Sequence, residues 1–191
     1  PERKNRLESI IFDIDGTLWD SRALVAEGYN LQLRAEGLDR FCTTAEALKP
    51  LFGKVMTEIG DALFGELPPE QRYSLMERCM ETENRYLREN PCNIGYPGVY
   101  ETLTALQKKH RLFIVSNSQC GYPELCIRKL GLESCITGHL CFGDTGTDKG
   151  STLRTLMQTY AITSAVYIGD TQGDMEATYA AGLPFVWADY G

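Results

Sequence analysis

The sequence lacks any run of about 18 apolar residues, the length that a helix needs to cross a bilayer. Its first residues do not resemble a signal peptide. Basic residues are also in the minority, because 19 Lys and Arg stand against 26 Asp and Glu, for a net charge of −7 at pH 7. An acidic chain repels phosphate backbones. We therefore expect no membrane and no nucleic acid as partner, and a small anionic substrate would need a local cation.

The cysteines do not form a disulfide pattern. There are seven between Cys42 and Cys141, an odd number spread along a chain of 191 residues, which predicts a reducing, cytoplasmic location. Cys120, Cys126, Cys135 and Cys141 contain no C-x₂-C pair. This spacing favours small buried apolar side chains over zinc ligands.

Short apolar runs separated by helical segments predict an α/β fold. The composition, 43% hydrophobic and 24% charged, is that of a globular protein. Strands alternating with helices indicate βαβ units and a parallel sheet. The predicted strands are Ser9–Phe12, Leu112–Val115, Ala165–Ile168 and Pro184–Trp187, with Cys135–Cys141 as a weaker candidate.

The stretch from Ser21 to Asn90 interrupts this alternation because it contains almost no strand-like run. We expect a small helical bundle inserted after the first strand. Residues 1–19 and 92–191 would then form the core, and residues 20–91 the inserted domain. The predicted helices of the insert are Ala23–Glu36, Thr44–Leu51, Val55–Phe64 and Glu70–Glu89.

Polar side chains follow three of the predicted strands, at the point where each strand ends. The carboxyl ends of parallel strands lie at one edge of a sheet, where ligands bind, so these side chains should share one pocket. Two acids one residue apart in an extended segment also point the same way. The residues concerned are Asp13 and Asp15, Ser116 and Asn117, and Asp170 with Asp174.

Four carboxylates in one pocket require a positive partner. Two such charges 4 Å apart repel each other by about 4 kcal/mol at an effective dielectric of about 20. Mg²⁺ suits a shell of carboxylates and water that also holds a phosphate. Lys149, at the start of a predicted helix, is the second candidate for a cation at this edge.

This combination of groups predicts phosphoryl transfer. One of Asp13 and Asp15 could attack phosphorus to form an aspartyl-phosphate, and the other could act as general acid and base. The metal and Lys149 would neutralise the transferred group. The Ser116 hydroxyl and nearby backbone N–H groups would hold the phosphate oxygens.

The motifs that carry these residues resemble those of the haloacid dehalogenase-like hydrolase superfamily, in the order in which that family has them. "DIDGT" at 13–17 resembles its first motif and "IVSNS" at 114–118 its second. Lys149 resembles the third and "GDTQGD" at 169–174 the fourth. Gly150 departs from the pattern, because many relatives have proline after the lysine. The resemblance implies a Rossmann-like, doubly wound parallel sheet.

The resemblance also implies a role for each matching residue. Asp13 would be the nucleophile, Asp15 the general acid and base, and Lys149 would stabilise both phosphate and nucleophile. An acid at position 15 argues against a true dehalogenase. Phosphate would be bound by Thr17, Ser116, Asn117 and Lys149, and Mg²⁺ by Asp13, the Asp15 carbonyl, Asp170 and Asp174.

The helical insert resembles the first type of cap in this family, which closes over the active site. Lys54 follows Gly53 between two predicted cap helices, where such caps tend to face the substrate. It is therefore a candidate for binding the leaving group, with a solvated lysine as the alternative. Trp19, near the expected hinge, is assigned to packing.

We expect a Mg²⁺-dependent phosphatase acting on a small phosphorylated metabolite such as phosphoglycolate, a sugar phosphate or pyrophosphate. The expected oligomeric state is a monomer or weak dimer. A phosphomutase of the same superfamily, similar to beta-phosphoglucomutase, is the alternative. A signalling receiver domain also uses acids at strand ends, but its first acids are adjacent and it has no insert of about 70 residues.

Overall fold

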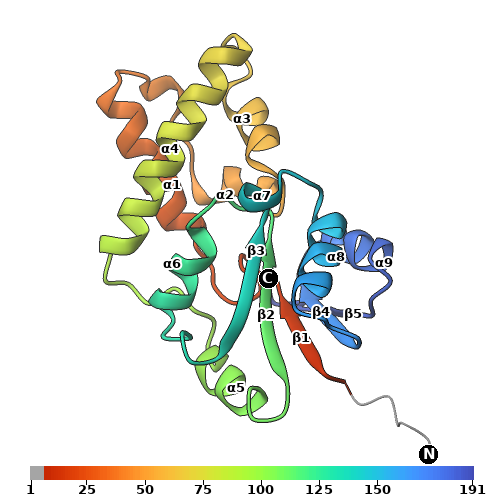
Figure 1. Ribbon diagram of the computed structural model, residues 1–191. Coiled ribbons are helices and arrows are strands. Elements are labelled where there is room, and N and C mark those ends of the chain that lie inside the picture. The colour runs from red at the N-terminus through yellow and green to blue at the C-terminus, as the bar shows by residue number, and fades with distance from the viewer. Residues whose placement is uncertain (1–6) are drawn as a thin grey trace, which may run out of the picture. The chain divides into compact units, whose positions relative to one another are not determined.

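The computed structural model describes residues 7–191, and the chain forms two compact units. The first, called the core unit here, contains the chain up to Asp20 together with Ile94–Gly191. The second, called the helical unit, contains Ser21–Asn93. The helical unit is therefore an insertion between the first strand and the rest of the core unit (Figure 1).

The core unit contains a parallel sheet with the strand order β3-β2-β1-β4-β5. The first strand lies in the middle, and the chain adds strands to one side and then to the other. This arrangement confirms the predicted doubly wound α/β fold. The strands are β1 (Ser9–Phe12), β2 (Arg111–Ser116), β3 (Ile136–Cys141), β4 (Ala165–Gly169) and β5 (Phe185–Trp187). The weaker candidate at 135–141 is thus a strand.

Helices cover both faces of this sheet. In Figure 1, α8 and α9 lie on one side of the strands and α5 and α6 on the other. A short helix, α7, follows β3 directly. The bounds are α5 (Val99–Leu106), α6 (Tyr122–Lys129), α7 (Phe142–Thr145), α8 (Lys149–Thr159) and α9 (Gln172–Ala180).

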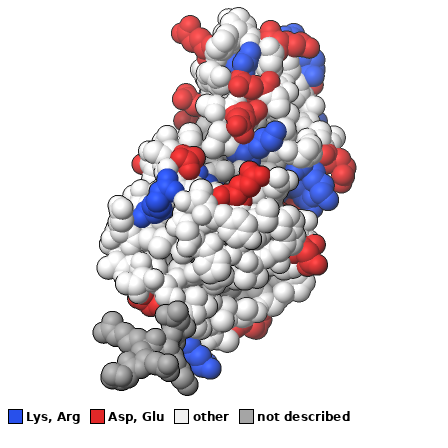
Figure 2. Space-filling model, turned by 90° about the vertical axis from the view of Figure 1, so that its right-hand side faces the viewer, with Lys and Arg blue, Asp and Glu red and all other residues white. Residues whose placement is uncertain are grey.

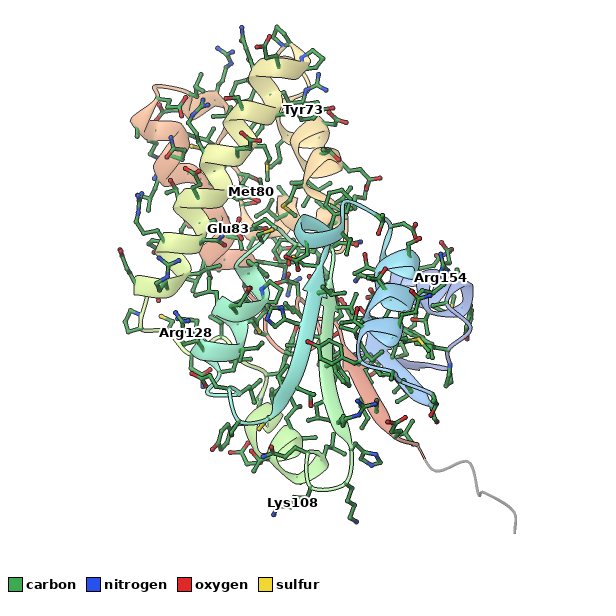
Figure 3. All side chains as sticks on the ribbon, in the orientation of Figure 1. Tyr73, Met80, Glu83, Lys108, Arg128 and Arg154 are labelled. Carbon is green, nitrogen blue, oxygen red and sulfur yellow. The ribbon has the colours of Figure 1, made fainter. Side chains whose placement is uncertain are left out.

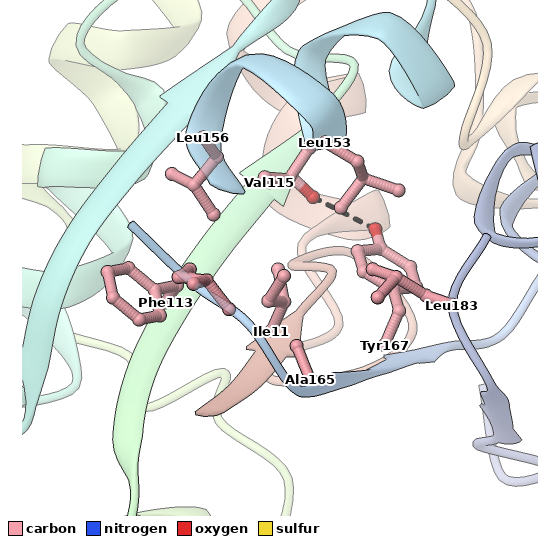
Figure 4. Close-up of a cluster of buried hydrophobic side chains, with 9 residues drawn as sticks. Ile11, Phe113, Val115, Leu153, Leu156, Ala165, Tyr167 and Leu183 are labelled. Carbon is pink, nitrogen blue, oxygen red and sulfur yellow. Dashed lines mark hydrogen bonds between the residues drawn. The ribbon is translucent and has the colours of Figure 1, made fainter. Parts of the chain in front are cut away.

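Side chains that alternate along the strands form the core beneath α8. Ile11, Phe113 and Tyr167 point to the same side, where Leu153 and Leu156 of α8 pack against them (Figure 4). The Tyr167 hydroxyl donates a hydrogen bond of 2.9 Å to the Val115 carbonyl. A buried phenol needs such a partner, so this bond holds the carboxyl-terminal halves of β2 and β4 together.

The helical unit is built on the packing of α1 (Arg22–Ala35) against α4 (Pro69–Glu89). Gly28 lies at a close contact of the two helices. A Cβ atom at this position would be 2.9 Å from the Cα atom of Glu83 on α4, the residue labelled in Figure 3. Between them in sequence lie α3 (Met56–Phe64), the short helix α2 (Ala45–Leu48) and the 3₁₀ turns η1 (Asp39–Phe41) and η2 (Lys49–Leu51). These elements follow the predicted helices closely.

Helix hydropathy and surface charge can both be described for residues 7–191. Within residues 7–191, no helix combines the length and the apolar character that crossing a membrane requires. On the face that Figure 2 draws, the described Lys and Arg side chains are scattered among Asp and Glu and form no continuous basic patch.

Candidate active site

The carboxyl ends of three neighbouring strands carry the residues singled out in the sequence. Phe12 at the end of β1 pairs with Ile114 of β2 and Ile168 of β4. Asp13, Ser116 and Asp170 come directly after or at the ends of these strands, and so lie at one edge of the sheet. The grouping predicted from the strand ends is therefore present within the core unit.

Lys149 joins this group from the first turn of α8. Its ammonium nitrogen lies 3.0 Å from Oδ1 of Asp13 and 2.5 Å from Oδ1 of Asp174. The side chain is only 4% exposed, as is that of Asp13. This burial shows that Lys149 is not a solvated residue of the helix start. Tyr167 lies beneath it, with the nitrogen 5.7 Å from the ring centroid.

The buried charges shift one another's protonation. Burial, followed by repulsion from Asp174, raises the pKa of Asp13 well above its ordinary value. Burial acts against the charged form of Lys149, but the carboxylates of Asp13 and Asp174 outweigh it and raise the pKa of the lysine. Burial and the neighbouring Asp174 raise the pKa of Asp170 to about 6. This group of side chains therefore favours the charged form of Lys149 and disfavours the charged forms of Asp13 and Asp170.

Asp174 is oriented by the start of α9. Its Oδ2 accepts hydrogen bonds from the Thr171 backbone N–H, at 3.1 Å, and from the Thr171 hydroxyl, at 2.8 Å. The Thr171 hydroxyl in turn accepts from the Asp174 backbone N–H. This reciprocal capping box satisfies groups at the helix start that would otherwise lack partners. It leaves Oδ1 of Asp174 facing Lys149.

Asp170 lies against the loop that follows β1. Gly16 has a φ of +79°, and a Cβ atom there would lie 2.1 Å from Oδ2 of Asp170. Only glycine combines this backbone conformation with so close an approach. The glycine of the first motif therefore brings the Asp13–Thr17 segment and the fourth-motif acid together.

Asp15 is held by two hydrogen-bond donors on one oxygen. Its Oδ1 accepts from the Trp19 indole N–H at 2.7 Å and from the Tyr122 hydroxyl at 2.7 Å. The two rings pack edge to face, with centroids 5.4 Å apart. Trp19 is fully buried, as expected for packing, but it also contacts the candidate acid. Tyr122 was not singled out, and no sequence pattern links it to a residue 107 positions away.

The candidate phosphate-binding hydroxyls are buried at the same edge. Ser116 ends β2, and its hydroxyl oxygen accepts a hydrogen bond of 3.2 Å from the Ser118 backbone N–H. The Thr17 hydroxyl is buried and has no hydrogen-bond partner among the described residues. Asn117 follows Ser116 directly. Polar groups in such positions are available to a ligand.

The acids of this edge fit a divalent cation. Asp13, Asp170 and Asp174 each offer an oxygen atom, and these atoms lie within 4.8 Å of one another. Oδ1 of Asp170 is buried and has no hydrogen-bond partner in the described part of the chain. A set of carboxylate oxygens is what Mg²⁺ requires. A bound ion would give Oδ1 of Asp170 the partner that it lacks among the described residues.

Lys54 lies apart from this group in sequence, in the helical unit. It is exposed, in the turn between η2 and α3, beside Gly53 with its φ of +85°. Its predicted contact with substrate stays a prediction, as does the role of the helical unit as a cap.

The parallel sheet, with acids at its strand ends and a buried lysine among them, places the chain among α/β proteins with a carboxylate-rich site. Comparison with known sequences gives its family. The family model described as haloacid dehalogenase-like hydrolase matches residues 10–188. The chain belongs to this family, which confirms the resemblance seen in its motifs. The matched range includes residues of both units.

Individual proteins of known sequence or structure are also similar to this chain. The chain is 29% identical over 195 residues to a phosphoglycolate phosphatase of Xanthomonas campestris pv. campestris, covering 96% of this chain and 83% of that protein. It is 30% identical over 192 residues to a phosphoglycolate phosphatase of Agrobacterium fabrum, covering 95% and 80%. The fold resembles that of a haloacid dehalogenase-like family hydrolase from Streptococcus pneumoniae, with a TM-score of 0.79, 18% identity, and coverage of 95% and 84%.

Proposed function

We propose that this chain is a Mg²⁺-dependent phosphatase that hydrolyses a small phosphorylated metabolite through an aspartyl-phosphate on Asp13. Phosphoglycolate is the first substrate to consider, because the relatives named above are phosphoglycolate phosphatases. Sugar phosphates and pyrophosphate stay within the proposed class. The enzyme class, phosphoric monoester hydrolase, agrees with the names of these relatives.

One observation carries the proposal: the ammonium of Lys149 is buried between the carboxylates of Asp13 and Asp174 at the carboxyl edge of the sheet. Burying three charges costs desolvation free energy, and charged groups with strongly shifted pKa values cluster at functional sites. A carboxylate nucleophile needs positive charge beside it when an anionic phosphoryl group approaches. Lys149 supplies that charge within 3.0 Å of the attacking group.

In the first step, a carboxylate oxygen of Asp13 forms a bond to phosphorus while the bond from phosphorus to the leaving oxygen breaks. Asp15 donates its proton to that leaving oxygen, which departs as an alcohol. Trp19 and Tyr122 donate to one oxygen of Asp15 and so hold its carboxyl group in one orientation. Orientation of this kind is a large part of general acid catalysis.

In the second step, water attacks the aspartyl-phosphate. Asp15, now a carboxylate, takes a proton from the water as the new bond to phosphorus forms. The bond between phosphorus and Asp13 breaks, and inorganic phosphate leaves. The two steps return both acids to their starting protonation states.

Mg²⁺ would be held by Asp13, Asp170 and Asp174, together with the Asp15 carbonyl. When bound, it supplies positive charge that offsets the charge of the transferred phosphoryl group. Thr17, Ser116 and Asn117, with Lys149, would bind the phosphate oxygens. Lys54 is the proposed contact of the helical unit with the rest of the substrate.

The test measures inorganic phosphate released from a panel of small phosphate esters, including phosphoglycolate, in the presence of Mg²⁺. Asp13→Asn removes the attacking charge with little change in shape, and we expect the rate to fall by at least about 10³-fold. Asp39→Asn, at an exposed position of the helical unit, is the matched control and should keep the parent rate.

Two results would contradict the proposal. Hydrolysis by Asp13→Asn at the parent rate would show that another group is the nucleophile. Conversion of a sugar 1-phosphate into an isomeric sugar phosphate, with no free phosphate, would identify the phosphomutase alternative instead.

A further inference from the structure

Two cysteines that are 21 positions apart in sequence meet at the ends of β2 and β3. Cys120 lies in the loop after β2, and Cys141 is the last residue of β3. These strands are neighbours, and Ser116 is in register with Cys141. The Sγ atoms of the two cysteines and a carboxylate oxygen of Asp144 on α7 all lie within 4.8 Å of one another.

Each thiol contacts a different oxygen of the same carboxylate. Sγ of Cys120 lies 3.6 Å from Oδ1 of Asp144, and Sγ of Cys141 lies 3.1 Å from Oδ2. Oδ2 also accepts a hydrogen bond of 2.9 Å from the Cys141 backbone N–H. The carboxylate is thus oriented by the backbone, and the two sulfur atoms are placed around it.

The surrounding backbone keeps this group together. A Cβ atom at Gly143 would lie 2.4 Å from the Cys120 backbone nitrogen and 2.9 Å from its Sγ. The Gly143 N–H donates to the Ser118 carbonyl at 3.1 Å, and the Cys141 thiol donates to the Gln119 carbonyl at 3.4 Å. The loop after β2 therefore packs directly on the start of α7.

We infer that Cys120, Cys141 and Asp144 form a binding site for a thiophilic divalent cation of the Zn²⁺ or Cd²⁺ class. In a tetrahedral site with Zn–S bonds of about 2.3 Å and Zn–O bonds of about 2.1 Å, a sulfur and an oxygen ligand are about 3.6 Å apart. The 3.6 Å contact of Cys120 has this spacing, and the 3.1 Å contact of Cys141 is about 0.5 Å shorter. Binding therefore requires small side-chain adjustments and no rearrangement of the strands.

The site has three protein ligands. Because it is partly open to solvent, water can take the fourth coordination position. Cys120 and Asp144 are exposed while Cys141 is buried, so an ion can enter from solvent. The donor set differs in kind from the carboxylates around Lys149, because thiolate sulfur selects Zn²⁺ and Cd²⁺ whereas carboxylate oxygen suits Mg²⁺. The two sites should therefore bind different ions.

The surroundings of both sulfur atoms favour the protonated thiol. Burial and the Asp144 carboxylate raise the pKa of the Cys120 thiol, and burial followed by hydrogen bonding to Asp144 raises that of Cys141. An ion that binds as a thiolate complex must displace a proton from each sulfur atom.

The test is a titration of the reduced whole chain with Cd²⁺ in excess Mg²⁺, following the ultraviolet charge-transfer absorbance of Cd–thiolate bonds. Excess Mg²⁺ occupies the carboxylate site, and the absorbance reports sulfur ligands only, so the result does not depend on the proposed phosphatase activity. We expect one Cd²⁺ per chain, displaceable by Zn²⁺.

Three variants and one control make the assignment specific. Cys120→Ser, Cys141→Ser and Asp144→Asn should each weaken binding by at least about tenfold, and each cysteine variant should lower the absorbance. Cys92→Ser, at another exposed cysteine, should bind like the parent. Circular dichroism checks that each variant is folded.

Two outcomes would overturn the inference. One is an absorbance titration of the reduced parent that shows no thiolate band, or a band that Cys120→Ser leaves unchanged. The other is a Cys120–Cys141 disulfide in the air-oxidised chain, found by mass spectrometry, together with no metal binding after reduction. The second result would identify the pair as a redox pair instead.

Discussion

Asp15 and Lys149 show how individual side chains are held in the candidate site. Lys149 is fixed by two carboxylates that are far apart in sequence, those of Asp13 and Asp174. Asp15 is fixed by two uncharged donors on a single oxygen. The first arrangement provides a permanent positive charge, and the second provides orientation without adding charge. A nucleophile and an acid need these two different surroundings.

Tyr122→Phe tests whether orientation of Asp15 matters. The substitution removes the 2.7 Å hydrogen bond to Asp15 but keeps the ring that packs on Trp19. If Asp15 is the general acid and base, we expect kcat to fall by about tenfold while KM changes little, because the substrate-binding groups are untouched. Steady-state kinetics on the phosphate ester hydrolysed best would measure both.

Tyr100→Phe is the matched control, since this tyrosine is 52% exposed and its loss of a hydroxyl should change neither constant. A rise in KM with unchanged kcat in Tyr122→Phe would argue for a substrate contact instead. Equal kinetics in both variants would show that Trp19 alone is enough to orient the acid.

At the scale of elements, the helical unit depends on the close contact of α1 and α4. Gly28 on α1 faces the α4 backbone at Glu83, where a Cβ atom would be only 2.9 Å from a Cα atom. Backbone atoms cannot turn aside as a flexible side chain can. Glycine at this position is therefore required by packing, although glycine is a poor helix former.

Gly28→Ala should destabilise the protein by about 1–3 kcal/mol, because the clash with α4 exceeds the gain of about 1 kcal/mol in helix propensity. Gly60→Ala on α3 is the control, since its added methyl would lie 3.5 Å from the Met76 side chain, an ordinary contact. Urea unfolding should show opposite signs for the two variants. A stabilised Gly28→Ala variant would contradict the assigned contact.

An ion pair adds a pH-dependent contribution to the same pair of helices. Arg78 of α4 donates to both carboxylate oxygens of Glu36, which follows α1, at 2.6 and 2.8 Å. Hydrogen bonding to Arg78 lowers the pKa of Glu36 from 4.5 to about 2. The folded state therefore holds the Glu36 carboxylate more firmly than the unfolded chain does.

The contribution of Glu36 should be complete above its unfolded pKa of 4.5 and should disappear as the pH falls toward 2. Both side chains are partly exposed, at 42% for Arg78 and 27% for Glu36, so we expect only about 1 kcal/mol after screening by solvent. Glu36→Gln should thus be less stable than the parent at neutral pH and equal to it near pH 2. Urea unfolding at several pH values measures this.

Glu89→Gln, at the exposed end of α4, is the control and should follow the parent at every pH. A constant difference between Glu36→Gln and the parent down to pH 2 would show that packing, and not the charge of Glu36, stabilises this contact.

At the scale of the whole molecule, metal binding and folding should be linked. The proposed ligands of Mg²⁺ come from distant parts of the chain, Asp13 near its start and Asp170 and Asp174 near its end. An ion that binds them together binds only the folded chain. Stability should therefore increase with Mg²⁺ concentration.

Mg²⁺ at about 100 times its dissociation constant should stabilise the fold by about 2.7 kcal/mol and raise the Tm by several degrees. Asp170→Asn should lose most of this rise, whereas Asp39→Asn should keep it. Differential scanning fluorimetry, with NaCl of matched ionic strength as reference, measures the effect. An equal rise in Asp170→Asn would show that the ion binds elsewhere.

The strands, the helical insertion and the positions of the site acids could be predicted from the sequence because the signals for them are local. The apolar runs at 9–12 and 165–168 mark strands, and the absence of such runs between 21 and 90 marks the helical insertion. Acids placed directly after strands must lie at the carboxyl edge of a parallel sheet. The positions of Asp13, Asp15 and Asp170 were therefore predictable from chain order alone.

Only the tertiary structure decided which side chains touch. Asp15 meets Tyr122 across 107 residues, and Cys120 meets Cys141 and Asp144, although cysteine spacing had disfavoured a metal site and Cys120 had been expected to be buried. The physical reason is that secondary structure depends on neighbours in sequence, whereas contacts between strand ends depend on strand order, register and loop packing. Gly143 illustrates this, since nothing in its local sequence shows that Cys120 packs against it.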